Sequence, residues 1–171
     1  MDTNGWARTW RSFMLRLFVA IDIPGTIQEQ LSGWKMAMRG ARWTQPDQMH
    51  LTLEFLGEQP IDLYREICES LESVQLTSFE LEFEGVGFFG SKKVPRTLWA
   101  DVRSSRELIG LQKKVCKRIQ ELGIKVEAPK FRPHLTLARL TRTHPHPKKN
   151  VTPVTSKTRK LPNNCKFLRI N

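Results

Sequence analysis

Two copies of a short segment that begins with histidine are the residues of this sequence best suited to chemistry. The segment HLTLEFL begins at His50 and recurs as HLTLARL at His134, with five of seven letters identical. Chance seldom produces such a match in a chain of this length, so the repeat indicates two related halves. A single histidine in a strand is more often a packing or surface residue, but the repetition favours a chemical role.

Each copy alternates as a β-strand does, which gives its polar residues a common face. Because residues i and i+2 point to the same side of a strand, His50 shares a face with Thr52 and His134 with Thr136. Two imidazoles facing each other can serve as general acid and general base, since the ordinary pKa of imidazole is about 6.5. The threonine hydroxyls can bind the non-bridging oxygens of a phosphate. The repeat therefore predicts phosphodiester cleavage without a metal or cofactor.

The remaining periodicity predicts an α+β core around these two strands. Capping-box spacing at Thr26 with Glu29, and at Ser104 with Glu107, predicts two helix starts, and a third helix is expected from about Ile61. Short apolar or alternating runs predict the strands, at residues 15–23, 49–56, 79–84, 96–102, 124–127 and 134–140.

The chain divides into a core, residues 14–140, between an N-terminal extension, 1–13, and a basic tail, 141–171, that is expected to be disordered. The tail holds eight Lys or Arg and no acid, so the net charge of +11 falls to +3 for residues 1–140. Total charge is therefore weak support for a nucleic-acid partner. No apolar run reaches the roughly 18 residues of a membrane span. Three widely spaced cysteines favour a reducing cytosol.

At these motifs the sequence resembles the two-histidine phosphoesterase superfamily, in particular the RNA 2′,3′-cyclic phosphodiesterases, also called 2′-5′ RNA ligases. The resemblance covers residues 14–140 and rests on the segments RLFVAIDIP, RWTQPDQMHLTLEFLGE, FEGVGFFGSKKVPRTLWADV and FRPHLTLARL. It implies a bilobal fold in which two antiparallel sheets, with helices outside, surround a central cleft about a pseudo-twofold axis.

The resemblance also implies roles for particular residues. His50 would protonate the leaving 3′ oxygen, His134 would activate water, and Thr52 and Thr136 would bind the phosphate. Phe55 would stack on a base or pack in the core, and Arg132 would contact phosphate or remain an exposed charge. Arg139 is a weaker phosphate candidate. Residues 141–171 show no counterpart of the strands that close the family fold, so those strands are expected to be missing.

Two functions follow from these features. The first is an enzyme, a cytoplasmic monomer that hydrolyses RNA with a 2′,3′-cyclic phosphate end, or a cyclic nucleotide, to the 2′-phosphate. Run in reverse, the same site would perform 2′-5′ ligation. The second is a catalytically impaired relative that binds RNA through its basic tail. The intact His-x-Thr pairs favour the enzyme, whereas the unusual C-terminal sequence favours the binding protein.

Overall fold

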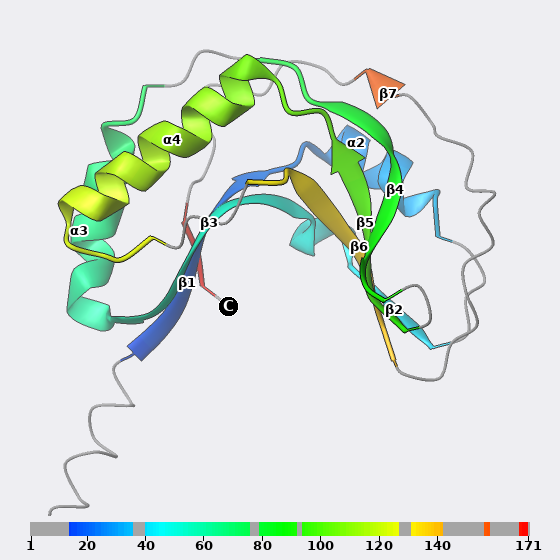
Figure 1. Cartoon of the computed structure of the whole chain (residues 1–171), viewed down its shortest axis with the longest axis horizontal. Helices are drawn as coiled ribbons and strands as arrows, with labels where there is room; N and C mark the ends of the chain where they lie inside the picture. Colours follow the sequence, from blue (N-terminus) through cyan, green and yellow to red (C-terminus); the bar gives the residue numbers. More distant parts are fainter. Residues whose placement is uncertain are drawn as a thin grey trace, which may run out of the picture.

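The computed structural model describes residues 14–35, 40–75, 79–91, 94–126 and 131–141, together with the backbone of 156–157 and 168–170. Helices are interspersed among the strands along these residues (Figure 1). The elements are β1 (Met14–Asp22), α2 (Gly25–Ser32), β2 (Ala41–Trp43), the 3-10 helix η1 (Pro46–Gln48), β3 (His50–Pro60), α3 (Ile61–Glu72), β4 (Glu82–Gly90), β5 (Pro95–Val102), α4 (Arg106–Glu121), β6 (His134–Leu140), β7 (Ser156–Lys157) and β8 (Leu168–Ile170).

The described strands form one antiparallel sheet. Their order is β7-β4-β5-β6-β3-β1-β8, and β2 also pairs with β6. We expected two separate sheets, but the half containing β1 and β3 joins the half containing β4, β5 and β6 where Leu51 pairs with Leu135. The predicted mixture of helices with an antiparallel sheet is confirmed, whereas the bilobal, pseudo-twofold arrangement remains a prediction.

The apolar faces of the strands and helices meet in one buried cluster. The run Leu17–Ile21 in β1 is buried throughout, which explains why this strand reads as continuously apolar. On α4 the buried residues recur at helical spacing, at Leu108, Leu111, Val115 and Ile119. Helices α3 and α4 pack against β3, and α2 lies at the other end of the sheet (Figure 1). The two histidine strands thus rest on a continuous apolar layer.

The observed N-caps of two helices lie one or two residues from the predicted caps. Helix α2 begins at Gly25, and the carbonyl of Pro24, rather than the Thr26 side chain, accepts from its first amides. Helix α4 is capped by Ser105, not Ser104, because the Ser105 hydroxyl accepts a hydrogen bond of 3.1 Å from the Leu108 amide. Helix α2 therefore has no side-chain cap, whereas α4 is capped by the serine that directly precedes its first residue.

The strands differ from the prediction at their ends. The alternation of Phe79, Leu81 and Phe83 does reflect burial, but the strand itself is β4, which begins at Glu82 and continues to Gly90. The run 124–126 forms no strand although Ile124 is buried, and residue 127 lies outside the described residues. Strand β2, of three residues, was too short for periodicity to reveal.

The C-terminal range is only partly described. We expected 141–171 to be a disordered tail without closing strands, yet β7 pairs with β4 and β8 pairs with β1, so both edges of the sheet gain a strand. The rest of that range after Thr141, and the N-terminal extension 1–13, lie outside the described residues. None of the helices that the structure describes has the length and apolar character that crossing a bilayer requires.

Candidate active site

The two histidines occupy equivalent places in neighbouring strands. His50 is the first residue of β3 and pairs across the sheet with Asp22, and His134 is the first residue of β6 and pairs with Asp101. Strands β3 and β6 are adjacent and antiparallel, with Leu51 opposite Leu135. The structure therefore brings together the two His-x-Thr segments that the sequence predicts to share a site.

Each imidazole is held by an equivalent hydrogen bond to the backbone carbonyl two residues earlier. Nδ1 of His50 lies 2.7 Å from the carbonyl oxygen of Gln48, and Nδ1 of His134 lies 2.8 Å from that of Arg132. A carbonyl oxygen can only accept, so each Nδ1 carries the proton and donates it. This leaves Nε2 of each ring as the atom that can take up or release a proton.

Aromatic rings hold each imidazole from the side. The ring of Phe18 lies 4.8 Å from that of His50, centroid to centroid. The rings of Phe89 and Trp99 lie 4.8 Å and 5.8 Å from that of His134, both edge-on. These contacts restrict the ring orientations and leave each imidazole half-buried. The site is thus pre-organised before any ligand arrives.

The Trp99 side chain, which contacts His134, also packs directly against Gly87 on the neighbouring strand β4. Its indole is 1% exposed, and it pairs across the sheet with Gly87 of β4. A methyl group at Gly87 would stand 2.3 Å from the nearest ring carbon, so only glycine leaves room for the indole. The guanidinium carbon of Arg132 lies 4.4 Å from the centroid of the Trp99 ring, in a cation–π contact.

Two equivalent bulges decide which residues follow the threonines on the same face. Leu53 in β3 and Leu137 in β6 are each left without a register partner, at the third position after the histidine. An extra residue reverses the alternation that follows it. Phe55 and Arg139 therefore share the face of the threonines, where strict alternation would place Glu54 and Ala138.

Because of the first bulge, the Glu54 carboxylate lies in the protein interior and not at the site. Glu54 is 8% exposed, and its Oε2 accepts a hydrogen bond of 3.1 Å from the thiol of Cys116 on α4. Its Oε1 accepts from the amide of Phe55, at 3.2 Å. A negative charge beside Thr52 would repel a phosphate, so the bulge removes an obstacle to anion binding.

The Cys116 thiol should be chemically inert while the protein is folded. Burial, and then the neighbouring carboxylate of Glu54, raise the pKa of Cys116 to about 12. Because the thiolate is the reactive form, iodoacetamide at pH 8 should label Cys68 well before Cys116. Peptide mass spectrometry after timed quenching would follow both residues.

Unfolding in urea serves as the control for this labelling, since both thiols should then react at similar rates. Glu54→Gln, which removes the charge but keeps the shape, should increase labelling of Cys116 in the folded protein. Equal labelling of the two cysteines in the folded wild type would contradict the buried pairing.

A groove of about 800 Å³ lies beside these strands, and we call it the histidine groove. Its lining includes Phe55, Arg96, Thr97, His134, Thr136 and Arg139. His50 and Thr52 are not part of this lining and lie on the adjoining strand β3. Phe55 is 64% exposed, so the alternative that it packs in the core is wrong. Arg132 is also outside the lining, over Trp99.

Sequence reasoning missed five of the nine residues that line the groove, namely Phe89, Arg96, Thr97, Leu140 and Thr141. Arg96 and Thr97 belong to a predicted strand, but no motif marks them as site residues. The face shared by Thr97 and Arg139, which are register partners, could be recognised only from the sheet. Lys92 and Lys93, weak candidates for RNA contact, lie outside the described residues. In the described part of the chain, no three potential metal ligands cluster.

Comparison with known proteins relates this arrangement to a family. The sequence profile described as LigT-like phosphoesterase matches residues 21–99 and 101–166. The match includes both histidine motifs. It also continues beyond residue 140, which corrects our expectation that nothing in the basic tail resembles the family.

Individual relatives agree with the profile. The chain is 35% identical to the RNA 2′,3′-cyclic phosphodiesterase of Archaeoglobus fulgidus over 138 residues, covering 77% of this chain and 76% of the relative. It is 35% identical to the protein of the same name from Thermotoga maritima over 132 residues, covering 74% and 70%. The crystal structure of E. coli LigT with 3′-AMP superposes with a TM-score of 0.64 at 25% identity, covering 89% of this chain and 98% of that one.

Proposed function

The chain belongs to the LigT-like phosphoesterases, a two-histidine phosphoesterase family, and we propose from this that it hydrolyses RNA ending in a 2′,3′-cyclic phosphate to the 2′-phosphate. Water attacks phosphorus, the bond from phosphorus to the 3′ oxygen breaks, and a 3′ hydroxyl is released. Relatives at 35% identity carry the name RNA 2′,3′-cyclic phosphodiesterase, which supports this substrate class.

The matching hydrogen bonds at the two histidines carry the proposal. Nδ1 of each imidazole donates to a backbone carbonyl at 2.7–2.8 Å, so each would transfer its proton through Nε2. One neutral imidazole takes a proton from water while the other, protonated, donates to the 3′ oxygen. By resemblance to the family, we assign water activation to His134 and protonation of the leaving group to His50.

Neighbouring side chains would hold the cyclic phosphate and the terminal base. The hydroxyls of Thr52 and Thr136 share the faces of the histidines and would donate to the non-bridging oxygens. Arg132, stacked on Trp99, is proposed as a further phosphate contact. The exposed ring of Phe55 would stack on a base, since a large apolar side chain left open on a strand is suited to a planar ligand.

The alternative, an impaired RNA-binding relative, rested on missing closing strands. Pairing of β8 with β1, and a family match that continues to residue 166, remove much of that basis. We therefore favour the catalyst over the binding protein. We further propose that it acts as a monomer in the cytosol. The same acid and base operating in reverse would join a cyclic phosphate end to a 5′ hydroxyl, but water in large excess favours hydrolysis.

Purified protein incubated with adenosine 2′,3′-cyclic phosphate, with and without EDTA, tests the proposal. We expect 2′-AMP as the product, identified by chromatography against 2′- and 3′-AMP standards. We also expect the same rate in both arms, because the described residues offer no cluster of three metal ligands near the histidines. Release of 3′-AMP would refute the proposed bond cleavage. A rate abolished by EDTA and restored by a divalent ion would refute metal independence.

A further inference from the structure

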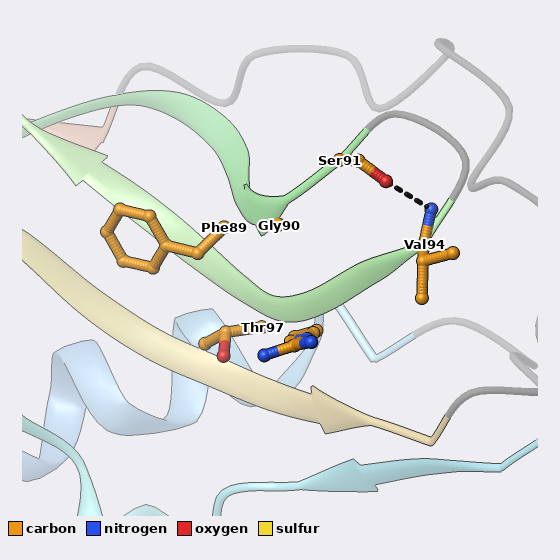
Figure 2. Close-up of a pocket in the computed structure, with 6 residues that line it drawn as sticks. Phe89, Gly90, Ser91, Val94 and Thr97 are labelled. Carbon is orange, nitrogen blue, oxygen red and sulfur yellow. Dashed lines mark hydrogen bonds between the residues drawn. The ribbon is translucent and has the colours of Figure 1, made fainter.

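A second hollow of about 770 Å³ adjoins the histidine groove. It lies at the turn between β4 and β5 and is lined by Phe89, Gly90, Ser91, Val94, Arg96 and Thr97. The Ser91 hydroxyl accepts a hydrogen bond of 3.0 Å from the Val94 amide. In Figure 2 the ring of Phe89 stands at the end of the hollow away from that turn.

The two hollows share a wall. Phe89, Arg96 and Thr97 line both of them, so a ligand can extend from one to the other. Phe89 also contacts the imidazole of His134, at 4.8 Å between centroids, and is 37% exposed. Both volumes fall within the roughly 300–1,000 Å³ typical of small-molecule sites. Together they offer room for more than one nucleotide.

The charge of this extended surface is positive. Among the described residues that line either hollow there are two arginines, Arg96 and Arg139, and no carboxylate. Neither arginine forms an ion pair within the described part of the chain. A guanidinium with no acid beside it attracts phosphate, and it can contact two phosphate oxygens at once.

The direction of an RNA strand determines what would occupy the second hollow. A 2′,3′-cyclic phosphate closes the 3′ end, so the chain can continue only through the 5′ oxygen of the terminal ribose. With the cyclic phosphate beside His134 and Thr136, the next phosphate must leave the histidine groove along its lining. Arg96 lines both hollows, so its guanidinium is placed to contact a phosphate that passes from one to the other.

We propose that the second hollow is a subsite for the nucleotide on the 5′ side of the cyclic phosphate end, and that Arg96 binds the phosphate linking it to the terminal nucleotide. Such a subsite would make the protein prefer oligonucleotides to cyclic mononucleotides. The inference rests on the proposed hydrolysis of cyclic phosphate ends. It adds where the RNA lies and which substrates react fastest.

Val94 offers a substitution that alters this subsite alone. It lines the second hollow but not the histidine groove, and it is 40% exposed, so polar side chains fit there without repacking. Val94→Glu and Val94→Lys place opposite charges beside the proposed nucleotide, and Val94→Thr changes shape least. Ile61→Glu, at a residue 45% exposed on α3, is the matched control for adding one charge elsewhere.

The experiment measures kcat/KM for adenosine 2′,3′-cyclic phosphate and for the dinucleotide ApA with a 2′,3′-cyclic phosphate end. Wild type should prefer the dinucleotide. That preference should fall about 3–10-fold in Val94→Glu and rise in Val94→Lys, because a single charge near a phosphate acts at this scale. Val94→Thr and Ile61→Glu should keep the wild-type preference, and turnover of the mononucleotide should be similar in all variants.

Other outcomes would overturn the subsite. No dinucleotide preference in wild type, or a preference independent of the charge at position 94, would show that the second hollow does not bind RNA. Equal effects of Val94→Glu on both substrates would show that the terminal nucleotide itself occupies it. In either case mononucleotide turnover would still support the proposed function. Failure of wild type to hydrolyse either substrate would overturn both proposals.

Discussion

Replacing His50 or His134 with alanine should lower kcat about 10²–10⁴-fold while leaving the protein folded. Each side chain is half-buried at the first residue of its strand, so its removal deletes the proton-transfer group and little of the apolar core. Turnover of adenosine 2′,3′-cyclic phosphate and the melting temperature, measured on the same preparation, separate the two effects. The wild-type rate should also follow a bell against pH, since one imidazole must be neutral and the other protonated.

Thr52→Val and Thr136→Val are the matched variants for this prediction. Each keeps the branched shape suited to a strand and deletes only a hydroxyl, so each should lower kcat less than loss of its histidine does. If the histidines were merely structural, their replacement would lower the melting temperature and leave kcat per folded molecule nearly intact.

Substituting Gly87 with alanine should damage both stability and turnover. The added methyl would overlap the buried ring of Trp99, with ring carbons 2.3 Å and 2.4 Å away. Overpacking of this kind costs about 1–3 kcal/mol, which corresponds to a melting temperature roughly 3–10 °C lower. A shifted indole would also displace His134, whose ring it contacts. We expect kcat to fall by about 10-fold or more, since small misplacements of catalytic groups are costly.

Gly110 on α4 provides the control for that substitution. A methyl there meets no atom within 4 Å, and alanine favours a helix interior by about 0.5–1 kcal/mol. Gly110→Ala should therefore raise the melting temperature slightly and leave turnover unchanged. Scanning calorimetry and the cyclic phosphate assay measure both properties. A Gly87→Ala protein as stable and active as wild type would contradict the packing assigned to Trp99.

The paired histidines could be recognised from sequence because they depend on local alternation. Period 2 places each histidine on the face of its threonine, whatever the rest of the fold does. Their backbone hydrogen bonds are also local, since each acceptor lies only two residues earlier in the chain. The predicted strands at both motifs are confirmed, with β3 extending further than expected.

Alternation alone could not assign the residues after the threonines, because a bulge reverses it. Phe55 and Arg139 were candidates only through the family resemblance. Nothing in HLTLEF marks Leu53 as the extra residue, so strict alternation places Glu54, rather than Phe55, on the face of Thr52. The choice depends on α4, where Cys116 donates to the Glu54 carboxylate from 62 positions away in sequence. Long-range contacts of this kind are set by tertiary packing, not by local propensity.

Periodicity also could not predict that the two halves join in one sheet. Each half has its own antiparallel pairs, which the family resemblance implies to be two sheets, but the single pairing of Leu51 with Leu135 in the described residues connects them. At the C-terminus, a basic, proline-containing stretch predicts disorder, and for the range as a whole this stays a prediction. Composition does not reveal that β7 and β8 inside it pair with the edge strands β4 and β1.

The most direct test of the central claim is the kcat of the double variant His50→Ala/His134→Ala compared with the two single variants. If the imidazoles form one proton-transfer unit, removing the second should cost little once the first is gone, because neither can complete the transfer alone. We therefore expect the double variant to be about as slow as the slower single variant. Losses that multiply, or a folded His134→Ala protein that retains nearly full turnover, would contradict the two-histidine mechanism.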